Sequence, residues 1–164
     1  MNISVVIPSY NRKDFLKRSI DSAINQTKKP LEVIVVDDGS TDGTETMIKS
    51  DYDFIKFIKQ KNKGVSAARN VGIKVSIGQW ICFLDSDDEW RKDKLEKQIV
   101  AMKSNPDYKF FHSNEIWMKN GKRINQKKKH KKYGGDIFEK CLDMCRISPS
   151  SVMIDKTVFD EVGN

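Results

Sequence analysis

Residues 33–40 read Val33-Ile34-Val35-Val36-Asp37-Asp38-Gly39-Ser40, which is four β-branched residues followed by two acids, a glycine and a serine. A short apolar run that stops at a turn signal predicts a buried strand ending in a loop. A helical pattern opens soon afterwards, at Thr44. This order of strand, loop and helix recurs along the chain, so the stretch sets the expectation for the whole fold.

Working outward from it, apolar periodicity predicts further strands at 3–7, 54–58 and 80–84, and helices at 14–24, 44–49, 66–75 and 92–103. Strands that alternate with helices favour right-handed crossovers. We therefore predict an α/β fold with a mostly parallel central sheet and helices on both faces.

After Pro106 the pattern weakens, and the elements become shorter. We expect a strand at 110–112, a polar and basic excursion at 121–135, a helix at 137–145, a strand at 150–154 and a final helix at 156–162.

The chain has 164 residues, of which 38% are hydrophobic and 32% charged, as expected for one globular domain. No apolar run approaches the roughly 18–20 residues that span a bilayer, and the N-terminus lacks a signal-peptide layout, so we expect a cytoplasmic protein. The odd number of cysteines argues against a disulfide framework. A zinc site at Cys141 and Cys145 would need both histidines as well, so we expect buried or half-buried thiols and oxygen-held metal.

The basic charge is local. Residues 122–132 contain seven Lys or Arg and no acid, which equals the whole formal charge of +7. Three interpretations stay open: a solvated loop, contact with anionic lipid or an anionic acceptor, and nucleic acid. Nucleic acid is the least favoured, because the run has no aromatic residue before Tyr133. Lipid contact would make the protein peripheral at the inner face of the membrane.

Two acidic stretches follow predicted strands. Asp37 and Asp38 offer hydrogen-bond acceptors for a base or ribose, although an Asx-type turn that caps the next helix explains them equally. In Asp85-Ser86-Asp87-Asp88, three acids within four residues repel one another unless a cation neutralises them, and hard oxygen ligands suit Mg²⁺ or Mn²⁺. Helix-dipole capping explains Asp88 but leaves Asp85 unexplained.

A third stretch, Asn62 to Gly72, is rich in small residues that let a helix start approach a ligand closely. Arg69 within it offers a planar fork to phosphate or to a neighbouring acid.

Four motifs in order carry a resemblance to family 2 glycosyltransferases of the GT-A fold. They are Val6-Ile7-Pro8-Ser9-Tyr10-Asn11-Arg12, Val36-Asp37-Asp38-Gly39-Ser40-Thr41-Asp42, Asn62-Lys63-Gly64-x-Ser66-x-Ala68-Arg69-Asn70-x-Gly72 and Leu84-Asp85-Ser86-Asp87-Asp88. Ser148 to Ile154 and Phe159 to Gly163 are similar to the family's acceptor-side strand and the helix after it.

The resemblance implies a set of site residues. Tyr10 would stack on the base, Asp38 would hydrogen-bond it with Asp37 behind, and Arg69 would lie near the base and diphosphate. The nucleotide pocket would be formed by Pro8, Ser9, Tyr10, Arg12, Asp37, Asp38, Arg69, Asp85 and Ser86, and the metal would be held by Asp87, Asp85 and Asp88.

The resemblance also implies an activity. With Mn²⁺ or Mg²⁺, the enzyme would transfer a sugar from a UDP-sugar, with inversion, to a saccharide or lipid-linked acceptor in cell-surface polysaccharide biosynthesis. In the family, the carboxylate base lies downstream of the segment matched by Phe159 to Gly163, so we expect it beyond Asn164.

We therefore expect residues 1–164 to be a single, C-terminally incomplete domain, with a nucleotide-binding half at 1–105 and the start of an acceptor-side half at 106–164. The alternative is a truncated module that binds a nucleotide sugar without efficient transfer.

Two other classes fail on the order of their motifs. A receiver domain needs an acid after its third strand, and here that strand is followed by Lys59-Gln60. A dinucleotide-binding domain needs G-x-G-x-x-G after its first strand, which this chain lacks.

Overall fold

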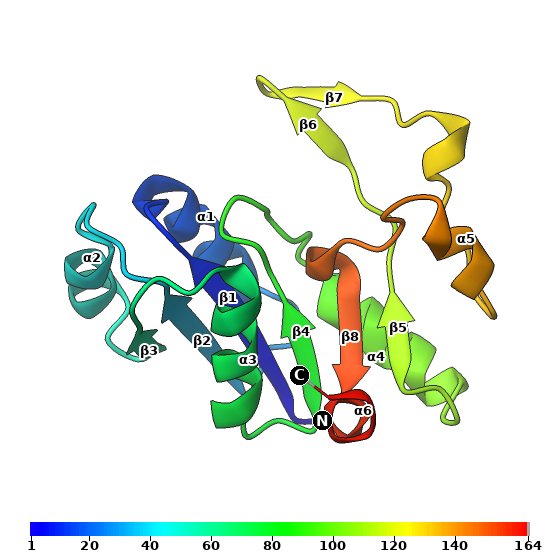
Figure 1. The fold of residues 1–164 in the computed structure, drawn as a ribbon, viewed down its shortest axis with the longest axis horizontal. Helices are drawn as coiled ribbons and strands as arrows, with labels where there is room; N and C mark the ends of the chain where they lie inside the picture. Colours follow the sequence, from blue (N-terminus) through cyan, green and yellow to red (C-terminus); the bar gives the residue numbers. More distant parts are fainter. Residues whose placement is uncertain (164) are drawn as a thin grey trace.

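A computed structural model describes residues 1–163. Its centre is a six-stranded sheet in the order β3-β2-β1-β4-β8-β5 (Figure 1). Strand β8 runs antiparallel to both of its neighbours, while β1, β2, β3 and β4 are mutually parallel. The strands are β1 (Ile3–Ser9), β2 (Glu32–Asp37), β3 (Lys56–Lys59), β4 (Trp80–Phe83), β5 (Phe110–His112) and β8 (Val152–Asp155).

Helices cover both faces of this sheet, which confirms the predicted α/β fold. Alternate residues of β1 point to opposite faces, so Val5 joins one apolar cluster and Val6 the other. The first cluster packs under α1 (Lys13–Ile24), α2 (Thr44–Asp51) and α4 (Lys94–Ser104). The second packs under α3 (Val65–Val75) and α6 (Thr157–Val162).

Several boundaries differ from the predictions for physical reasons. The strand expected at 54–58 begins at Lys56, because Ile55 closes a turn onto Tyr52 and both are buried. The strand expected at 150–154 begins at Val152, after a 3₁₀ turn, η2 (Pro149–Ser151). The helix expected at 137–145 shortens to α5 (Phe138–Leu142), which buries no residue.

The excursion expected at 121–135 contains structure that the sequence analysis missed. Strand β7 (Lys122–Ile124) pairs with β6 (Trp117–Lys119) in a hairpin, and η1 (Lys128–His130) follows. Asn120 and Gly121 both have positive φ, of 50° and 72°, as a tight two-residue hairpin turn requires. An Asn-Gly pair is the expected signal for such a turn, so the sequence contained the information.

The topology places four loops at one edge of the sheet. Strands β1, β2 and β4 end there at Ser9, Asp37 and Phe83, and the loop after β3 leads into α3 beside them. In open parallel sheets ligands bind outside these carboxyl ends. Within residues 1–163, no helix has both the length and the apolar character needed to cross a membrane.

Gly72 sets how closely α3 approaches β1. A Cβ on this buried residue would lie 2.2 Å from Cγ1 of Val6, which is far inside van der Waals contact. We expect Gly72→Ala to lower the free energy of unfolding by about 1–3 kcal/mol, because overpacking outweighs the higher helix propensity of alanine. Urea unfolding measures this, with the exposed Lys74→Ala of the same helix as a control that stays within about 0.5 kcal/mol of the parent. Equal stabilities would contradict the close approach.

Candidate functional site

A pocket of about 530 Å³ lies at this edge of the sheet, and we call it the edge pocket. It brings together residues from all four loops, including most of the predicted nucleotide-binding set. Of the predicted residues, Asp37 lies buried outside the lining, and Asp88 is also absent from it. The lining consists of Pro8, Ser9, Tyr10, Arg12, Asp38, Asn62, Gly64, Val65, Ala68, Arg69, Asp85, Ser86 and Asp87.

Asp38 holds the loop that forms one wall of the edge pocket. One carboxylate oxygen accepts hydrogen bonds from Gln60 Nε2 at 2.7 Å and the Lys63 backbone N–H at 2.8 Å, and the other accepts from the Gly64 N–H at 2.8 Å. Burial alone would raise the pKa of Asp38, but these donors outweigh it and lower the pKa. The side chain therefore fixes the start of α3 as an ionised acceptor.

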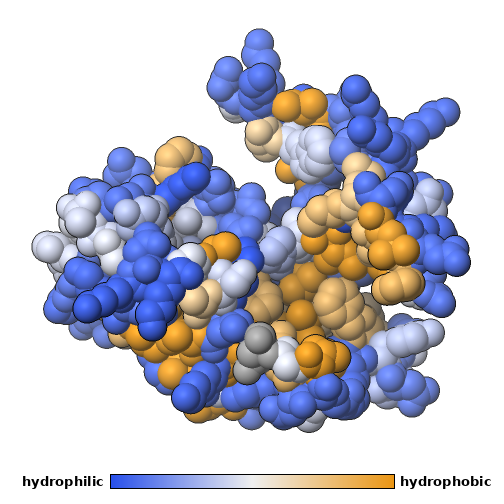
Figure 2. Space-filling view, in the orientation of Figure 1, coloured by the Kyte–Doolittle hydropathy of each residue, from blue (hydrophilic) through white to orange (hydrophobic). Residues whose placement is uncertain are grey.

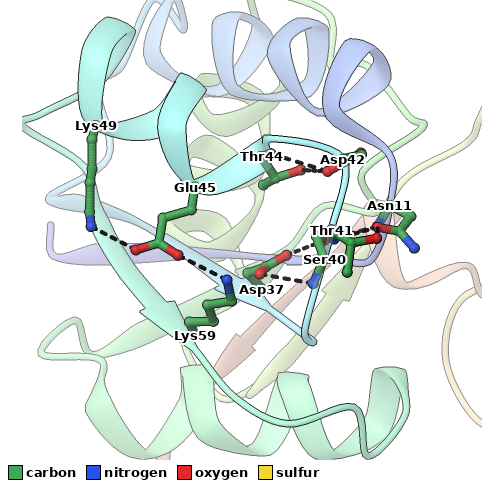
Figure 3. Close-up of polar contacts among 9 residues, drawn as sticks. All are labelled: Asn11, Asp37, Ser40, Thr41, Asp42, Thr44, Glu45, Lys49 and Lys59. Carbon is green, nitrogen blue, oxygen red and sulfur yellow. Dashed lines mark hydrogen bonds and ion pairs between the residues drawn. The ribbon is translucent and has the colours of Figure 1, made fainter.

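Asp37 stabilises the loop after β2 (Figure 3). Its carboxylate accepts from the Ser40 N–H at 3.1 Å and from the Ser40 hydroxyl. The same hydroxyl accepts from the Asn11 N–H at 2.9 Å, and the Asn11 side chain in turn accepts from the Thr41 N–H at 2.8 Å. These bonds tie the loops after β1 and β2 together, so Asp37 lies beneath the pocket as a structural residue.

Asp42 completes this arrangement by serving two helices. One oxygen accepts from the Lys13 N–H at 2.9 Å, at the start of α1, and the other accepts from Thr44, at the start of α2. Burial opposes the charge, yet these hydrogen bonds lower the pKa of Asp42. A carboxylate at the first turn also interacts favourably with the helix dipole.

A second hollow of about 590 Å³ lies beside α2, but its charged groups are paired with one another. Glu45 accepts from Lys49 at 2.6 Å and from Lys59 at 2.9 Å, which lowers the pKa of Glu45 to about 2 (Figure 3). The edge pocket is therefore the stronger candidate site.

Two ion pairs link the acidic loop, residues 85–88, to the other walls of the edge pocket. Asp85 pairs with Arg69 of α3 at 2.6 Å, and Asp87 pairs with Arg12 at 2.7 Å. The side chains of Arg12 and Asp87 are both 48% exposed, whereas those of Arg69 and Asp85 are 21% and 30% exposed. The Arg69–Asp85 pair therefore lies inside the pocket, and the Arg12–Asp87 pair lies at its solvent-exposed rim.

Ser150 positions the acidic loop from the turn before β8, which begins at the edge where the neighbouring β4 ends. Its hydroxyl donates to Asp88 Oδ2 at 2.6 Å and accepts from the Asp85 N–H at 3.0 Å. Partial burial raises the pKa of Asp88, the charges of Asp85 and Asp87 add to this, and the bond from Ser150 acts in the opposite direction. Sequence reasoning missed this residue, because three serines lie within 148–151 and nothing local separates them.

Three side chains that follow the acidic loop hold the segment that carries Ser150. Trp90 Nε1 donates to the Ser150 carbonyl at 2.8 Å, and Gln98 Nε2 donates to the Ser151 carbonyl at 2.9 Å. The Lys94 ammonium, 9% exposed, donates to Gln98 at 2.7 Å, lies 3.5 Å from the Val152 carbonyl and sits 3.9 Å from the Trp90 ring centroid. Burial lowers the pKa of Lys94.

Two buried polar atoms in the lining of the edge pocket lack a hydrogen-bond partner within residues 1–163. They are the Ser9 hydroxyl and Arg69 Nε. Buried polar groups in native proteins are normally paired, so unpaired ones in a pocket fit a polar ligand that completes them. Tyr10 lies nearby, 49% exposed, with its ring available for stacking.

The edge pocket therefore combines two arginines, three acids, residues with unpaired polar atoms and an exposed aromatic ring. Arginine binds phosphate oxygens, while carboxylates bind divalent cations. Across the described chain, no group of three or more His, Cys, Asp or Glu side chains has a metal-binding arrangement. Asp85 and Asp87 are each paired with an arginine, while Asp38 is held by three N–H donors. Cys82, Cys141 and Cys145 are all free thiols; Cys82 is buried as predicted, whereas Cys141 and Cys145 are exposed, because the segment around α5 packs on no core.

The sequence is similar to those of known glycosyltransferases. The family model described as Glycosyl transferase family 2 matches residues 4–163. An uncharacterised glycosyltransferase of Rickettsia felis is 38% identical over 97% of this chain and 27% of its own length. The Escherichia coli UDP-Glc:alpha-D-GlcNAc-diphosphoundecaprenol beta-1,3-glucosyltransferase WfaP is 34% identical over 94% of this chain and 61% of its own. The chain thus spans about a quarter of the Rickettsia relative.

Solved structures share the fold. TarS of Staphylococcus aureus in complex with UDP-GlcNAc superposes with a TM-score of 0.74 at 22% identity, covering 98% of this chain and 47% of TarS. The mannosyltransferase PcManGT of Pyrobaculum calidifontis, in complex with GDP-Man and Mn²⁺, gives 0.70 at 18% identity, covering 99% and 47%. These likenesses confirm the predicted GT-A architecture.

Replacing Asp38 by its amide tests the loop contacts. We expect Asp38→Asn to lower the free energy of unfolding at pH 7 by about 1–3 kcal/mol, because hydrogen bonds to a charged acceptor are strong. Since folding lowers this pKa, the contribution is present above the ordinary value of 3.8 and is lost as the pH falls through the lower folded value. Denaturant unfolding of the parent and of Asp38→Asn should show that their difference in free energy of unfolding is smaller at pH 3 than at pH 7. A difference that does not change with pH would contradict an ionised Asp38.

Removing the Ser150 hydroxyl tests the support of the acidic loop. We expect Ser150→Ala to raise the pKa of Asp88 further, because the variant lacks the one hydrogen bond that favours its ionised form. Carbon-detected NMR titration of the Asp88 carboxyl measures this. Ser151→Ala is the matched control, because the Ser151 hydroxyl donates to the Ser148 carbonyl and leaves Asp88 unchanged. If the Asp88 carboxyl had the same pKa in both variants, the hydrogen bond from Ser150 would not be what favours its ionised form.

Proposed function

We propose a function from one premise: the chain belongs to glycosyl transferase family 2. The edge pocket binds a nucleotide-sugar donor, and the acidic loop faces its diphosphate. Residues 1–105 carry this donor site, and residues 106–164 begin the half of the same domain that faces the acceptor. Transfer of the sugar by the whole protein is part of the proposal.

The observation that carries the proposal is the composition of the edge pocket. Arg69 and Asp85 lie within it, Arg12 and Asp87 lie at its rim, and two of its lining residues, Ser9 and Arg69, carry a buried polar atom without a hydrogen-bond partner among the described residues. A nucleoside diphosphate supplies the matching groups: phosphate oxygens for the guanidinium groups, hydroxyls for carboxylates and a planar base for an aromatic ring.

Each residue is proposed to take the role that the family resemblance implies. Tyr10, with Pro8 beside it, stacks on the base, and Asp38 orients it while holding the Lys63–Gly64 backbone. Arg69 exchanges part of its contact with Asp85 for phosphate oxygens, which frees Asp85 and Ser86 to face ribose or sugar. Asp37 stays beneath the pocket and supports the loop.

A UDP-sugar is the donor that the relatives favour. WfaP, at 34% identity, is by its name a UDP-Glc-dependent enzyme that acts on a diphosphoundecaprenol-linked sugar. We therefore propose a UDP-sugar donor and a glycan acceptor, free or lipid-linked, in the synthesis of a cell-surface polysaccharide, with inversion at the anomeric carbon. The family's carboxylate base was expected beyond Asn164, which lies outside the described residues.

We further propose that Mn²⁺ or Mg²⁺ accompanies the donor. The acidic loop fits such an ion, because Asp87 and Asp85 offer hard oxygen ligands on the pocket wall and Asp87 is half exposed. Asp88 is bonded to Ser150, so it serves as an additional ligand only if that bond is given up. When bound, the ion supplies positive charge that stabilises the leaving diphosphate. Phosphate oxygens complete a shell that the protein alone does not provide.

Titration calorimetry with UDP, with and without Mn²⁺, tests the donor site. We expect binding that strengthens with Mn²⁺, and we expect Asp87→Asn to weaken the Mn²⁺-dependent binding by about tenfold or more, since even outer-shell substitutions cost roughly 10–100-fold in metal affinity.

Asp51→Asn is the control for that titration. Asp51 is also a half-exposed aspartate in an ion pair, with Lys17 at 3.2 Å, but it lies outside the edge pocket. The control should bind UDP like the parent. The proposal fails if the parent binds no UDP, and the metal assignment fails if Asp87→Asn and Asp51→Asn behave alike.

A further inference from the structure

The hairpin of β6 and β7 belongs to a strongly cationic segment. Between residues 116 and 135 there is no Asp or Glu, and there are eight basic side chains, Lys119, Lys122, Arg123, Lys127, Lys128, Lys129, Lys131 and Lys132. The two strands pair only with each other, in a sheet separate from the central one. Figure 1 shows the hairpin standing away from the body of the molecule, beyond the end of β5.

This segment is folded onto its own base, which weakens the solvated-loop interpretation. Lys132, with a side chain only 8% exposed, pairs with Glu115 at 2.5 Å, and Gln126 Nε2 donates to the Glu115 carbonyl at 3.1 Å. The Trp117 ring packs on His130 with 4.8 Å between centroids. The remaining cations are therefore presented from a fixed scaffold.

Apolar side chains accompany the cations on the hairpin. Ile116, Met118 and Ile124 are 48%, 58% and 39% exposed, and Trp117 is 37% exposed. Across the strands, Trp117 lies opposite Ile124, while Lys119 lies opposite Lys122 at the turn. Figure 2 shows apolar groups set among hydrophilic ones in this part of the surface. Single exposed apolar residues need no explanation, but Trp117 and Ile124 share one face of the hairpin with Lys119 and Lys122, and this mixed apolar and basic face indicates a contact surface.

We infer that the β6–β7 hairpin docks on an anionic lipid surface. Basic side chains are attracted to anionic head groups, and tryptophan with aliphatic neighbours favours the interface between head groups and acyl chains. The mixture fits lipid better than nucleic acid, because the exposed apolar groups other than Trp117 are aliphatic, which leaves no series of aromatic platforms on which successive bases could stack.

Docking there would orient the edge pocket toward the membrane. The Ser113 N–H, just before the base of the hairpin, donates to the Ser151 carbonyl at 3.1 Å. The neighbouring Ser150 hydroxyl bonds Asp85 and Asp88 of the acidic loop. Hairpin and acidic loop therefore lie at the same edge of the sheet. The inference goes beyond the proposed function and does not depend on it, since lipid contact and donor binding use different residues.

Co-sedimentation with vesicles tests the inference. The chain should bind vesicles of equimolar phosphatidylcholine and phosphatidylglycerol and not vesicles of phosphatidylcholine alone, and the binding should weaken with salt. The triple variant Lys119→Gln, Lys122→Gln, Arg123→Gln should bind the anionic vesicles about tenfold to a hundredfold more weakly, given roughly 1 kcal/mol for each cation near the surface.

A charge-matched control separates location from net charge. Lys28→Gln, Lys74→Gln, Lys103→Gln removes the same charge from exposed positions at the opposite edge of the sheet, where α1, α3 and α4 lead into the next strands. This control should keep vesicle binding. Urea unfolding of both triple variants beside the parent shows that each is folded, and this readout does not depend on donor binding.

Tryptophan fluorescence gives a second readout that needs no charge variant. Trp80 and Trp90 are buried, at 5% and 8% exposure, so a blue shift on adding anionic vesicles reports Trp117, and Trp117→Phe should abolish it. The inference is overturned if the parent ignores anionic vesicles, if both triple variants lose binding equally, if Trp117 shows no shift, or if a single-stranded oligonucleotide binds more tightly than the vesicles and displaces them.

Discussion

The parallel pairing of β1 with both β2 and β4 is the constraint on which the rest of this structure depends. All seven residues of β1 are buried, and its register places Ser9 beside Asp37 and Val6 beside Phe83. Because parallel strands end at the same edge, three loops meet there. Gly72 lets α3 pack closely on β1, and this packing places Arg69 of α3 beside those loops. The register of the backbone therefore determines where in the fold the edge pocket lies.

Placing so many acids at one edge requires a specific donor for each. Asp38 is held by three N–H groups, Asp37 by Ser40, Asp85 by Arg69, Asp87 by Arg12 and Asp88 by Ser150. These partners differ in how easily they are exchanged. The backbone donors are fixed, whereas the arginine pairs are partly exposed and can be redistributed when a ligand enters. The structure therefore separates acids that build the pocket from acids that remain adaptable.

Sequence reasoning recovered the fold because the strands are short apolar runs and the helices keep a clear periodicity. It located β3 two residues early, since Ile55 is buried in a turn and an apolar residue there reads as strand. It overlooked the hairpin, although Asn120-Gly121 signals one, because the flanking strands are only three residues long and exposed. The sequence motifs identified which residues line the edge pocket, but they did not identify the hydrogen-bond and ion-pair partners of those residues. Ser150 and Lys94 could not, because their roles arise from contacts some 60 residues apart in sequence.

The contacts of Ser150 have a consequence for how the chain assembles. Side chains within residues 85–98 donate hydrogen bonds to the carbonyls of residues 150–151. The Ser150 hydroxyl in turn bonds Asp85 and Asp88 of the acidic loop, so the two segments hold each other in place. These contacts join residues about 60 positions apart, and closing so long a loop costs conformational entropy that the contacts must offset. The acidic loop therefore cannot gain its contacts with Ser150 before residues 150–152 have been synthesised, so its final conformation depends on a segment that comes much later in the chain.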